Sequence, residues 1–324
     1  MLSTTRCRIA VIGAGSWGSA VARLLAKNGH RVALWARRPE LAEAINTTHH
    51  NPDYLKEVEL SAGVEATADL SEALAGAAGI VVALPSFSVD QGCRDLPELP
   101  LLLLSKGFNA DGRFLLEGRR QLAVLSGPNH AEEVARDINS ATVIAAREPG
   151  LAEFWQDLLA SPTFRVYSSR DVVGVQTCAA VKNIIAIACG AAAGIGGGDN
   201  TLAALITRGV AELARLAEAL GGQSSTCMGL AGIGDLIATC LSKFSRNRSF
   251  GLALAQGASF KQYRAEHKMV VEGAYAAQVV PGLAAAHQVE MPICESIYEV
   301  VWQNKSIADA YQDIVSRPLK AEFL

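Results

Sequence analysis

The sequence lacks paired cysteines, a strong charge of either sign and any low-complexity segment. Its 7 cysteines are scattered, with no Cys-x-x-Cys pair and no cysteine–histidine cluster at the spacing of a zinc site. An odd number of cysteines in a long chain favours a reduced, intracellular protein, and we expect no metal site. The net charge of −3 provides no general attraction to nucleic acid or to an anionic membrane, so we expect no nucleic-acid partner.

The chain also lacks a signal-like start. The apolar run after Arg6 reaches glycine within a few residues, which is too short for the core of a signal peptide. The longest apolar stretch, residues 172–198, carries Lys182 and Asn183 near its middle. Such side chains are costly inside a bilayer, so the stretch predicts a buried helix followed by a glycine loop. We therefore expect a cytoplasmic protein with no integral membrane segment.

What the sequence does contain is a regular alternation of short apolar runs and helical patterns. A length of 324 residues suggests two domains, and a change of pattern places them at residues 1–170 and 171–324. In the first, near-continuous apolar runs predict an α/β domain with a doubly wound, mostly parallel sheet. The expected strands are 8–12, 31–36, 79–84, 101–105, 122–126 and 142–146, with 164–167 as a further candidate, and helices are expected at 17–28 and 39–46.

The second half predicts an all-α domain. Thr201 is the expected N-cap of a long amphipathic helix that stops at the glycine pair 221–222. Further helices are expected near residues 250–256, 271–287 and 293–304.

The clearest motif is G-x-G-x-x-G between an apolar run and a helical pattern. Gly13 permits a tight turn, Gly15 lets a pyrophosphate approach the backbone, and Gly18 lets helix and strand pack closely. The start of the helix, which includes Ser16 and Trp17, then offers free N–H groups to the phosphates. This arrangement predicts that NAD or NADP is bound here.

The expected second strand ends in Arg37 and Arg38, with no acidic residue to contact a ribose hydroxyl. Two guanidinium groups suit a 2′-phosphate, so we expect NADP to be accepted. The alternative is that one arginine stacks on adenine and the other is solvated. A later glycine run, residues 194–198, follows a helical pattern and is interpreted as a loop.

Lys182 is the only charged residue between Asp171 and Asp199. Desolvation lowers the pKa of a buried lysine and allows it to exchange protons near neutral pH, while the neighbouring Asn183 could orient a substrate oxygen. The alternative is a lysine that reaches the surface of its helix.

Other polar residues follow predicted strands or precede predicted helices. Lys106 and the segment from Ser126 to Asn129 follow strands, where α/β folds bind ligands. The segment could contribute backbone N–H groups to a ligand, and the alternative is a simple turn. Residues 245–248, Ser-Arg-Asn-Arg, form a cluster of anion ligands ahead of a helix expected to start near Phe250. Asp235 either pairs with Lys182 or caps a helix. For Lys106 and for residues 245–248, a solvated surface role is the alternative.

Taken in order, these segments resemble the bacterial NAD(P)-dependent glycerol-3-phosphate dehydrogenases, from about residue 8 to residue 304. The stretches that carry the resemblance are 11–18, 51–55, 105–107, 126–128, 164–167, 180–183, 231–235, 245–247 and 271–273. The resemblance implies a Rossmann domain and a helical domain similar to that of 6-phosphogluconate dehydrogenase. It implies the reversible reduction of dihydroxyacetone phosphate to sn-glycerol 3-phosphate with NADPH or NADH, for glycerophospholipid synthesis, and it is compatible with a homodimer.

The resemblance also implies roles for particular residues, with Lys182 as the proton acceptor. The residues that it implies for the substrate, together with Lys182 and Asn183, are Lys106, Gly127, Asn129, Asp235, Ser245, Arg246 and Asn247. Those that it implies for the cofactor, together with the three glycines, are Ser16, Trp17, Arg37, Arg38, Tyr54, Lys106, Ala131, Arg246, Val270 and Glu272.

The chain departs from the family pattern at three places. Asn129 stands where the family usually has serine or threonine, and Lys56 stands where it tends to have proline. The segments 89–100 and 109–122 are shorter than usual, so we expect reduced helices on one sheet face.

Two other functions fit parts of the pattern. A dehydrogenase of a carboxylate substrate, similar to ketopantoate reductase or to a 3-hydroxyacid dehydrogenase, would share the architecture but would not by itself require the Ser-Arg-Asn cluster. A non-enzymatic NAD(P)H sensor would have no evident need for a lysine in an apolar helix.

Overall fold

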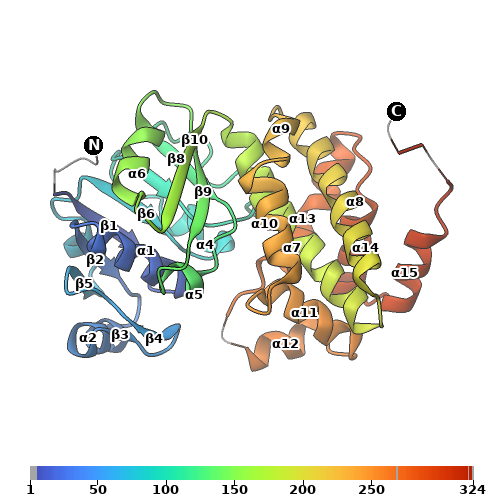
Figure 1. Ribbon diagram of the computed structural model, residues 1–324, viewed down its shortest axis with the longest axis horizontal. Helices are drawn as coiled ribbons and strands as arrows, with labels where there is room; N and C mark the ends of the chain where they lie inside the picture. Colours follow the sequence, from blue (N-terminus) through green and yellow to red (C-terminus); the bar gives the residue numbers. More distant parts are fainter. Residues whose placement is uncertain (1–5, 268, 320, 323–324) are drawn as a thin grey trace.

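The computed structural model describes residues 6–267, 269–319 and 321–322, and it has a sheet-containing N-terminal half beside a helical C-terminal half (Figure 1). The main sheet consists of β1 (Arg8–Ile12), β2 (Arg31–Trp35), β5 (Val64–Thr67), β6 (Gly79–Val82), β7 (Leu101–Leu103), β8 (Leu122–Ser126), β9 (Ser140–Ala146) and β10 (Phe164–Ser169). The strand order is β10-β9-β8-β7-β6-β1-β2-β5, and only β8 and β9 pair antiparallel. The predicted doubly wound, mostly parallel sheet is confirmed.

One strand of this sheet, β5, was not predicted from the sequence. β5 alternates buried and exposed residues, because it lies at the edge of the sheet beside β2. An alternating run of four residues lacks the continuous apolar character on which the other predictions rested. A separate pair, β3 (His50–Asn51) with β4 (Leu55–Glu59), was also not predicted.

Both faces of the sheet are covered, which explains why its strands are apolar throughout. Ile9 and Val11 of β1 belong to one core cluster, and Ala10 and Ile12 belong to the other. The helices of the N-terminal half are α1 (Ser16–Lys27), α2 (Pro39–Thr48), α3 (Leu70–Leu74), α4 (Ser86–Gly92), α5 (Ala131–Val134) and α6 (Leu151–Leu159).

The connection from β7 to β8 contains no helix in the described structure, as its short length suggested. The vacant part of the sheet face is covered by α7 (Val172–Gly194), whose residues share a core cluster with Ile80 of β6 and Leu103 of β7. Gln176 of α7 donates a hydrogen bond to the carbonyl of Leu115 in this shortened connection, at 3.3 Å. The first helix of the C-terminal half is therefore built into the sheet-containing half.

The other helices of the C-terminal half surround α7. They are α8 (Asp199–Ala219), α9 (Ser224–Cys227), the π-helical turn η1 (Leu230–Gly234), α10 (Asp235–Leu241), α11 (Arg246–Ala255), α12 (Phe260–Glu266), α13 (Glu272–Ala286), α14 (Pro292–Gln303) and α15 (Ile307–Val315). Two glycines allow α7 and α11 to approach closely: a Cβ on Gly190 would lie 2.1 Å from the Arg248 carbonyl oxygen, and one on Gly251 would lie 2.1 Å from that of Ile187.

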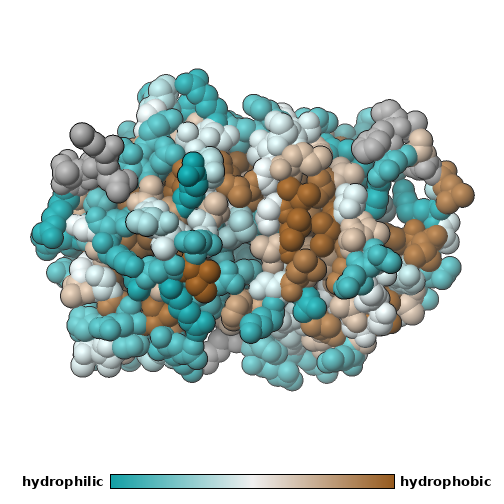
Figure 2. Space-filling view, in the orientation of Figure 1, coloured by the Kyte–Doolittle hydropathy of each residue, from teal (hydrophilic) through white to brown (hydrophobic). Residues whose placement is uncertain are grey.

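Two apolar segments pass a length and composition test for a membrane span. The first is α7, but 94% of its apolar window is buried inside the protein, as befits a core helix. The second, Ser224–Leu241, is divided among α9, η1 and α10 and is only 39% buried. Met228, Ile237 and Leu241 of this segment are exposed, and we call these three residues the apolar strip. Figure 2 shows hydrophobic surface, in brown, near the middle of the view.

Two predicted helix starts were wrong. α8 begins at Asp199 with Gly198 as N-cap, so Thr201 lies in its first turn and does not cap it. α11 begins at Arg246, four residues before Phe250, because the Ser245 hydroxyl accepts the Arg248 N–H at 3.2 Å and caps the helix. All seven cysteines are free thiols.

Candidate active site

The glycine turn after β1 has the geometry of a phosphate cradle. A Cβ on Gly13 would lie 2.7 Å from the Ala83 carbonyl oxygen, and a Cβ on Gly18 would lie 1.9 Å from that of Gly13. By contrast, Gly15 faces open space: apart from its chain neighbours, no described atom lies within 4 Å of a Cβ built there. Gly15 is also the N-cap of α1, and no described side chain caps that end. The turn therefore fits a pyrophosphate, which would use the space above Gly15 and the first N–H groups of α1.

A loop from Asn51 to Tyr54 is anchored against this turn. Buried Asn51 donates from Nδ2 to the Ala14 carbonyl at 2.9 Å and to the Ser19 hydroxyl at 2.8 Å, while its Oδ1 accepts the Tyr54 N–H at 3.2 Å. The Ser16 hydroxyl donates to the Tyr54 carbonyl at 3.0 Å. These bonds hold Tyr54 beside the cradle. Asn51 is a positioning residue for which the sequence predicted no role.

Arg37 and Arg38 follow the end of β2 but differ in their surroundings. Both are exposed. Arg38 forms an ion pair with Asp53 of the anchored loop, whereas no described residue forms an ion pair with Arg37. A 2′-phosphate at this point would compete with Asp53 for Arg38 and would find Arg37 available.

Lys182, Asp235 and Lys106 form a buried array of charges. Lys182 Nζ lies 3.0 Å from Asp235 Oδ1, and Lys106 Nζ lies 2.7 Å from Asp235 Oδ2. The hydroxyl of Ser126 donates to the same Oδ2 at 3.2 Å, and the hydroxyl of Thr239 accepts from Lys182 Nζ at 2.8 Å. Only 4% of the Lys182 side chain is exposed, so it does not reach the surface of its helix.

Four separate elements bring these groups together. Lys106 follows β7 and Ser126 ends β8, both at the carboxyl edge of the sheet. Asp235 begins α10. Lys182 is 11 residues beyond Asp171, the N-cap of α7, and a helix rises about 1.5 Å per residue, so α7 carries it about 16 Å along the sheet to the same edge.

The surroundings shift the pKa values of both partners. Burial lowers the pKa of Lys182 to about 8; the charge of Asp235 opposes this shift and that of Lys106 adds to it. Burial alone would raise the pKa of Asp235, but Lys106 and Lys182 outweigh it and the pKa is lowered. An ionised aspartate therefore lies between two lysines, one of which exchanges its proton near neutral pH.

The three residues of the Ser-Arg-Asn cluster have different surroundings in the structure. Ser245 is occupied as the N-cap of α11. Buried Asn247 donates to Asn183 Oδ1 at 2.9 Å and accepts the Gly273 N–H at 2.9 Å, so it joins α7, α11 and α13. Asn183 Oδ1 also accepts from Lys182 Nζ at 3.2 Å. Arg246 is the exposed cation of this group. Burial raises the pKa of Glu272 and that of Tyr263, and the charge of Arg246 is close enough to each to oppose the rise.

The segment after β8 borders the lysine array. A Cβ on Gly127 would lie 2.9 Å from Thr142 Cα, so the backbone approaches β9 closely there. Asn129 donates from Nδ2 to the Ala141 carbonyl at 2.9 Å, while its buried Oδ1 has no hydrogen-bond partner among the described residues. Ala131 begins α5.

The segment that joins α12 to α13 reaches back to the glycine turn. Met269 Sδ lies 4.0 Å from the Ser16 hydroxyl, and Val270 follows it. Glu272 then begins α13, and its carboxylate accepts hydrogen bonds from Ser86 of α4.

Two residues near the array, Ser86 and Thr239, were not predicted as ligands or partners. Thr239 offered a signal, because it lies four residues after Asp235 and hence on the same helix face. Ser86 follows a strand in the same way as Lys106, and that placement was the available signal. Ser126 belongs to the predicted segment 126–129, but the bond from its hydroxyl to Asp235 was not predicted.

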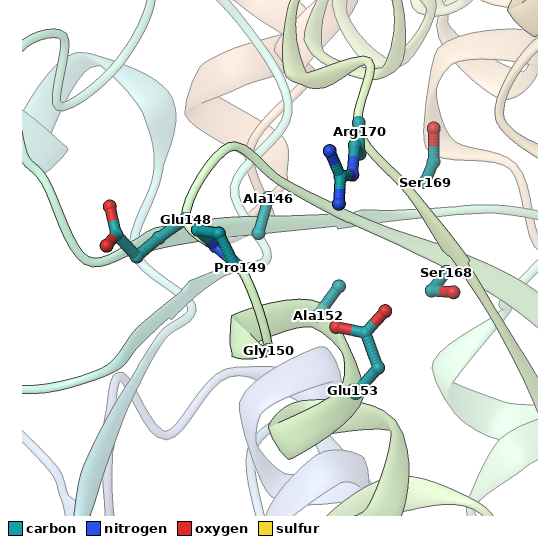
Figure 3. Close-up of a pocket in the computed structure, with 9 residues that line it drawn as sticks. All are labelled: Ala146, Glu148, Pro149, Gly150, Ala152, Glu153, Ser168, Ser169 and Arg170. Atoms are coloured by element: carbon teal, nitrogen blue, oxygen red, sulfur yellow. The ribbon is translucent and has the colours of Figure 1, made fainter.

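A small hollow elsewhere is separate from this site. It has a volume of about 180 Å³ and includes Glu148, Glu153 and Arg170 (Figure 3). It lies near Ala146, which pairs with Ala123 at the amino end of β8, whereas Ser126 marks the carboxyl end. The hollow is therefore at the sheet edge opposite Lys106 and Ser126.

Comparison with known proteins agrees with this geometry. The model of the N-terminal domain of NAD-dependent glycerol-3-phosphate dehydrogenase matches residues 8–152, and that of the C-terminal domain matches residues 171–312. A glycerol-3-phosphate dehydrogenase [NAD(P)+] of Moorella thermoacetica is 47% identical over 321 residues, which cover 96% of each chain. The chain belongs to the NAD-dependent glycerol-3-phosphate dehydrogenase family.

Further relatives support the same assignment. The dehydrogenase of this name from Rhodospirillum rubrum is 45% identical, over 97% of this chain and 93% of its own. The crystal structure of a glycerol-3-phosphate dehydrogenase from Coxiella burnetii superposes with a TM-score of 0.92 at 34% identity, covering 96% of this chain and 99% of that one. Membership of this family implies NAD or NADP as cofactor.

Proposed function

We propose that this protein reduces dihydroxyacetone phosphate reversibly to sn-glycerol 3-phosphate with NADPH or NADH, and so supplies a precursor of glycerophospholipids. The observation that carries the proposal is the buried Lys182, with a pKa of about 8, held by Asp235 at the same edge of the sheet as the cofactor cradle. The name shared by the relatives supports the choice of substrate.

Lys182 is the acid–base residue of this mechanism. In the reductive direction its ammonium group donates a hydrogen bond to the C2 ketone and then protonates the developing alkoxide. In the oxidative direction its neutral amine takes the proton of the C2 hydroxyl. The nicotinamide, when bound, carries the hydride. Asp235, Thr239 and Asn183 hold Nζ through the contacts described above and so fix its direction.

The net charge of the site favours a phosphorylated substrate. With Lys182 protonated, the two lysines and one aspartate carry a net charge of +1 in a buried site, which suits an anion. Exposed Arg246 would bind the phosphate, while Ser245 and Asn247 shape the pocket through the cap of α11 and the bond to Asn183. The other proposed substrate contacts are Lys106, Gly127, Asn129 and Asp235.

The cofactor would lie along the carboxyl edge of the sheet. Its pyrophosphate would occupy the cradle of Gly13, Gly15 and Gly18, bordered by Ser16 and Trp17. Arg37 and Arg38 would receive a 2′-phosphate. The remaining proposed contacts are Tyr54, Lys106, Ala131, Arg246, Val270 and Glu272.

The decisive experiment follows NADPH absorbance with purified protein. We expect oxidation with dihydroxyacetone phosphate and none with ketopantoate or without a substrate. Turnover of ketopantoate would favour the carboxylate dehydrogenase instead. Tight NADPH binding with no turnover of either compound would favour the sensor.

We also propose a cytoplasmic homodimer, with residues 1–170 and 171–324 as its two domains. The exposed apolar strip supports self-association: Met228 is 65% exposed, Ile237 42% and Leu241 53%. A groove of about 1770 Å³ between α8, α14 and α15 adds further unfilled surface. Light scattering during gel filtration tests the dimer, and Leu241→Glu should convert it to a monomer.

A further inference from the structure

Glu272 is bound by a single residue of the opposite half of the molecule. Ser86 donates its backbone N–H to Oε1 at 3.1 Å and its hydroxyl to Oε2 at 2.5 Å. Ser86 is buried, with 3% of its surface exposed, and is the first residue of α4. Glu272 is the first residue of α13. Both carboxylate oxygens are therefore held from the same side by one serine.

This contact lies between the glycine turn and the lysine array. Ser86 follows β6 by a few residues, and Ala83 between them touches Gly13 of the turn. A Cβ on Gly107 would lie 2.7 Å from Ser86 Cβ and 3.8 Å from Glu272 Oε2. Gly107 directly follows Lys106, which binds Asp235. Ser86 and Glu272 thus lie between the chain segments that carry the cradle and the array, and the bound nicotinamide would enter the space between those segments.

The reacting end of the cofactor must enter that space. Hydride transfer requires the nicotinamide ring and the substrate carbon to lie about 3–3.5 Å apart, and the substrate is expected at Lys182. The nicotinamide carboxamide has an NH₂ group that requires an acceptor when water is excluded. Ser86 uses one lone pair of each Glu272 oxygen and leaves another lone pair on each.

We propose that Ser86 is a positioning residue that fixes the Glu272 carboxylate as the acceptor for the nicotinamide carboxamide. This inference rests on the proposed function, because it assumes NAD(P) in the cradle. Ser86 acts on the cofactor through Glu272. Gly107 leaves the space that the Ser86 side chain occupies, because any side chain at position 107 would displace Ser86.

The Ser86 hydroxyl also affects the ionisation of Glu272. Burial raises its pKa, and the two hydrogen bonds from Ser86 oppose that rise. Among the described residues, the charged group that acts on Glu272 is Arg246 of α11, which also opposes the rise. Without the Ser86 hydroxyl the carboxyl group would protonate at a higher pH and lose acceptor capacity.

The test compares two ligands that differ only in the nicotinamide end. Dissociation constants of NADH and of ADP-ribose are measured by fluorescence titration and calorimetry for wild type and Ser86→Ala; neither ligand carries a 2′-phosphate that titrates. We expect NADH to bind about tenfold more weakly to the variant, the usual effect of losing a hydrogen bond to a charged group, and ADP-ribose to bind unchanged. Equal weakening of both ligands, or of neither, overturns the proposal.

Matched variants separate positioning from general damage. Ser88→Ala removes a hydroxyl from the same helix whose one hydrogen bond to a described residue is to the Pro85 carbonyl, at 2.9 Å. This change should leave the binding of both ligands unaffected. Ser86→Thr keeps the hydroxyl and should restore NADH binding. The NADH affinity of Ser86→Ala should also fall at a higher pH than that of wild type as pH is lowered, and a coincident pH profile contradicts the proposal.

A second variant keeps the test decisive if Ser86→Ala does not fold. Glu272→Gln cannot ionise, so its NADH affinity should lose the pH dependence attributed to Glu272; retention of that dependence rules out this carboxylate. Failure of the proposed function looks different, because wild type would then not oxidise NADPH with dihydroxyacetone phosphate at all. Normal turnover by wild type with no nicotinamide-specific effect of Ser86→Ala defeats the inference alone.

Discussion

Lys182 Nζ and Asp235 Oδ1 lie 3.0 Å apart, with 4% of each side chain exposed. Removing one partner of such a buried pair leaves an uncompensated charge, which is costly for folding as well as for catalysis. Here the aspartate also binds Lys106 and Ser126, and the lysine also binds Thr239 and Asn183. The pair is thus the centre of a network whose parts can be tested separately.

Lys182→Ala should reduce kcat for dihydroxyacetone phosphate by about 10²- to 10⁴-fold, the usual contribution of a positioned acid or base. NADPH affinity should change little, because the cradle is untouched. Steady-state kinetics and an NADPH titration measure the two effects. Retention of most of kcat at neutral pH would show that another group transfers the proton.

The pKa of about 8 for Lys182 predicts opposite pH profiles in the two directions. The reductive reaction requires the protonated lysine, so kcat/KM for dihydroxyacetone phosphate should fall as pH rises through about 8. The oxidative reaction requires the neutral amine, so kcat/KM for sn-glycerol 3-phosphate should rise over the same range. Asp235→Asn removes a charge that raises this pKa, so both transitions should move to lower pH.

Thr239→Val should lower kcat by about five- to tenfold, because Lys182 Nζ loses a hydrogen-bond acceptor and its direction is less well fixed. Thr177→Val is a matched control. Thr177 is also buried on a helix and donates to the carbonyl four residues earlier, at 2.8 Å, but it does not bond to Lys182. Equal effects of the two substitutions on kcat would point to general destabilisation.

Arg246→Ala should reduce kcat/KM for dihydroxyacetone phosphate by about 30- to 1000-fold, as expected when one charge-assisted contact worth about 2–4 kcal/mol is lost. Any turnover of unphosphorylated dihydroxyacetone, measured at saturating NADPH, should fall much less, because this compound offers no phosphate. Arg264→Ala, at an exposed arginine of α12, serves as the control. An unchanged KM for dihydroxyacetone phosphate would exclude Arg246 as the phosphate ligand.

Arg37→Asp should raise KM for NADPH much more than KM for NADH, because Arg37 is free to bind a 2′-phosphate while Arg38 is paired with Asp53. Measuring both constants for variant and parent gives the change in preference. If the preference for NADPH over NADH stays the same, Arg37 does not bind the 2′-phosphate.

The chain order of apolar runs was enough to predict most of the fold. β1, β6 and β8 are short apolar segments buried on both faces, a local property that survives in the sequence. β5 was missed because an edge strand is only half buried. The position of α7 over the sheet was not predicted. It is possible because no helix lies between β7 and β8, and it results from packing between segments that are distant in the chain.

The sequence by itself determined the cradle of Gly13, Gly15 and Gly18 and the burial of Lys182, because both follow from neighbours within a few residues. Only the tertiary structure decided that Asp235 pairs with Lys182. It also placed Thr239 and Ser126 around the Lys182–Asp235 pair. Ser245 and Asn247 bond within the protein because of the same packing. These are contacts between separate helices and strands. Their distances depend on how the elements pack, and no local pattern of residues encodes that packing.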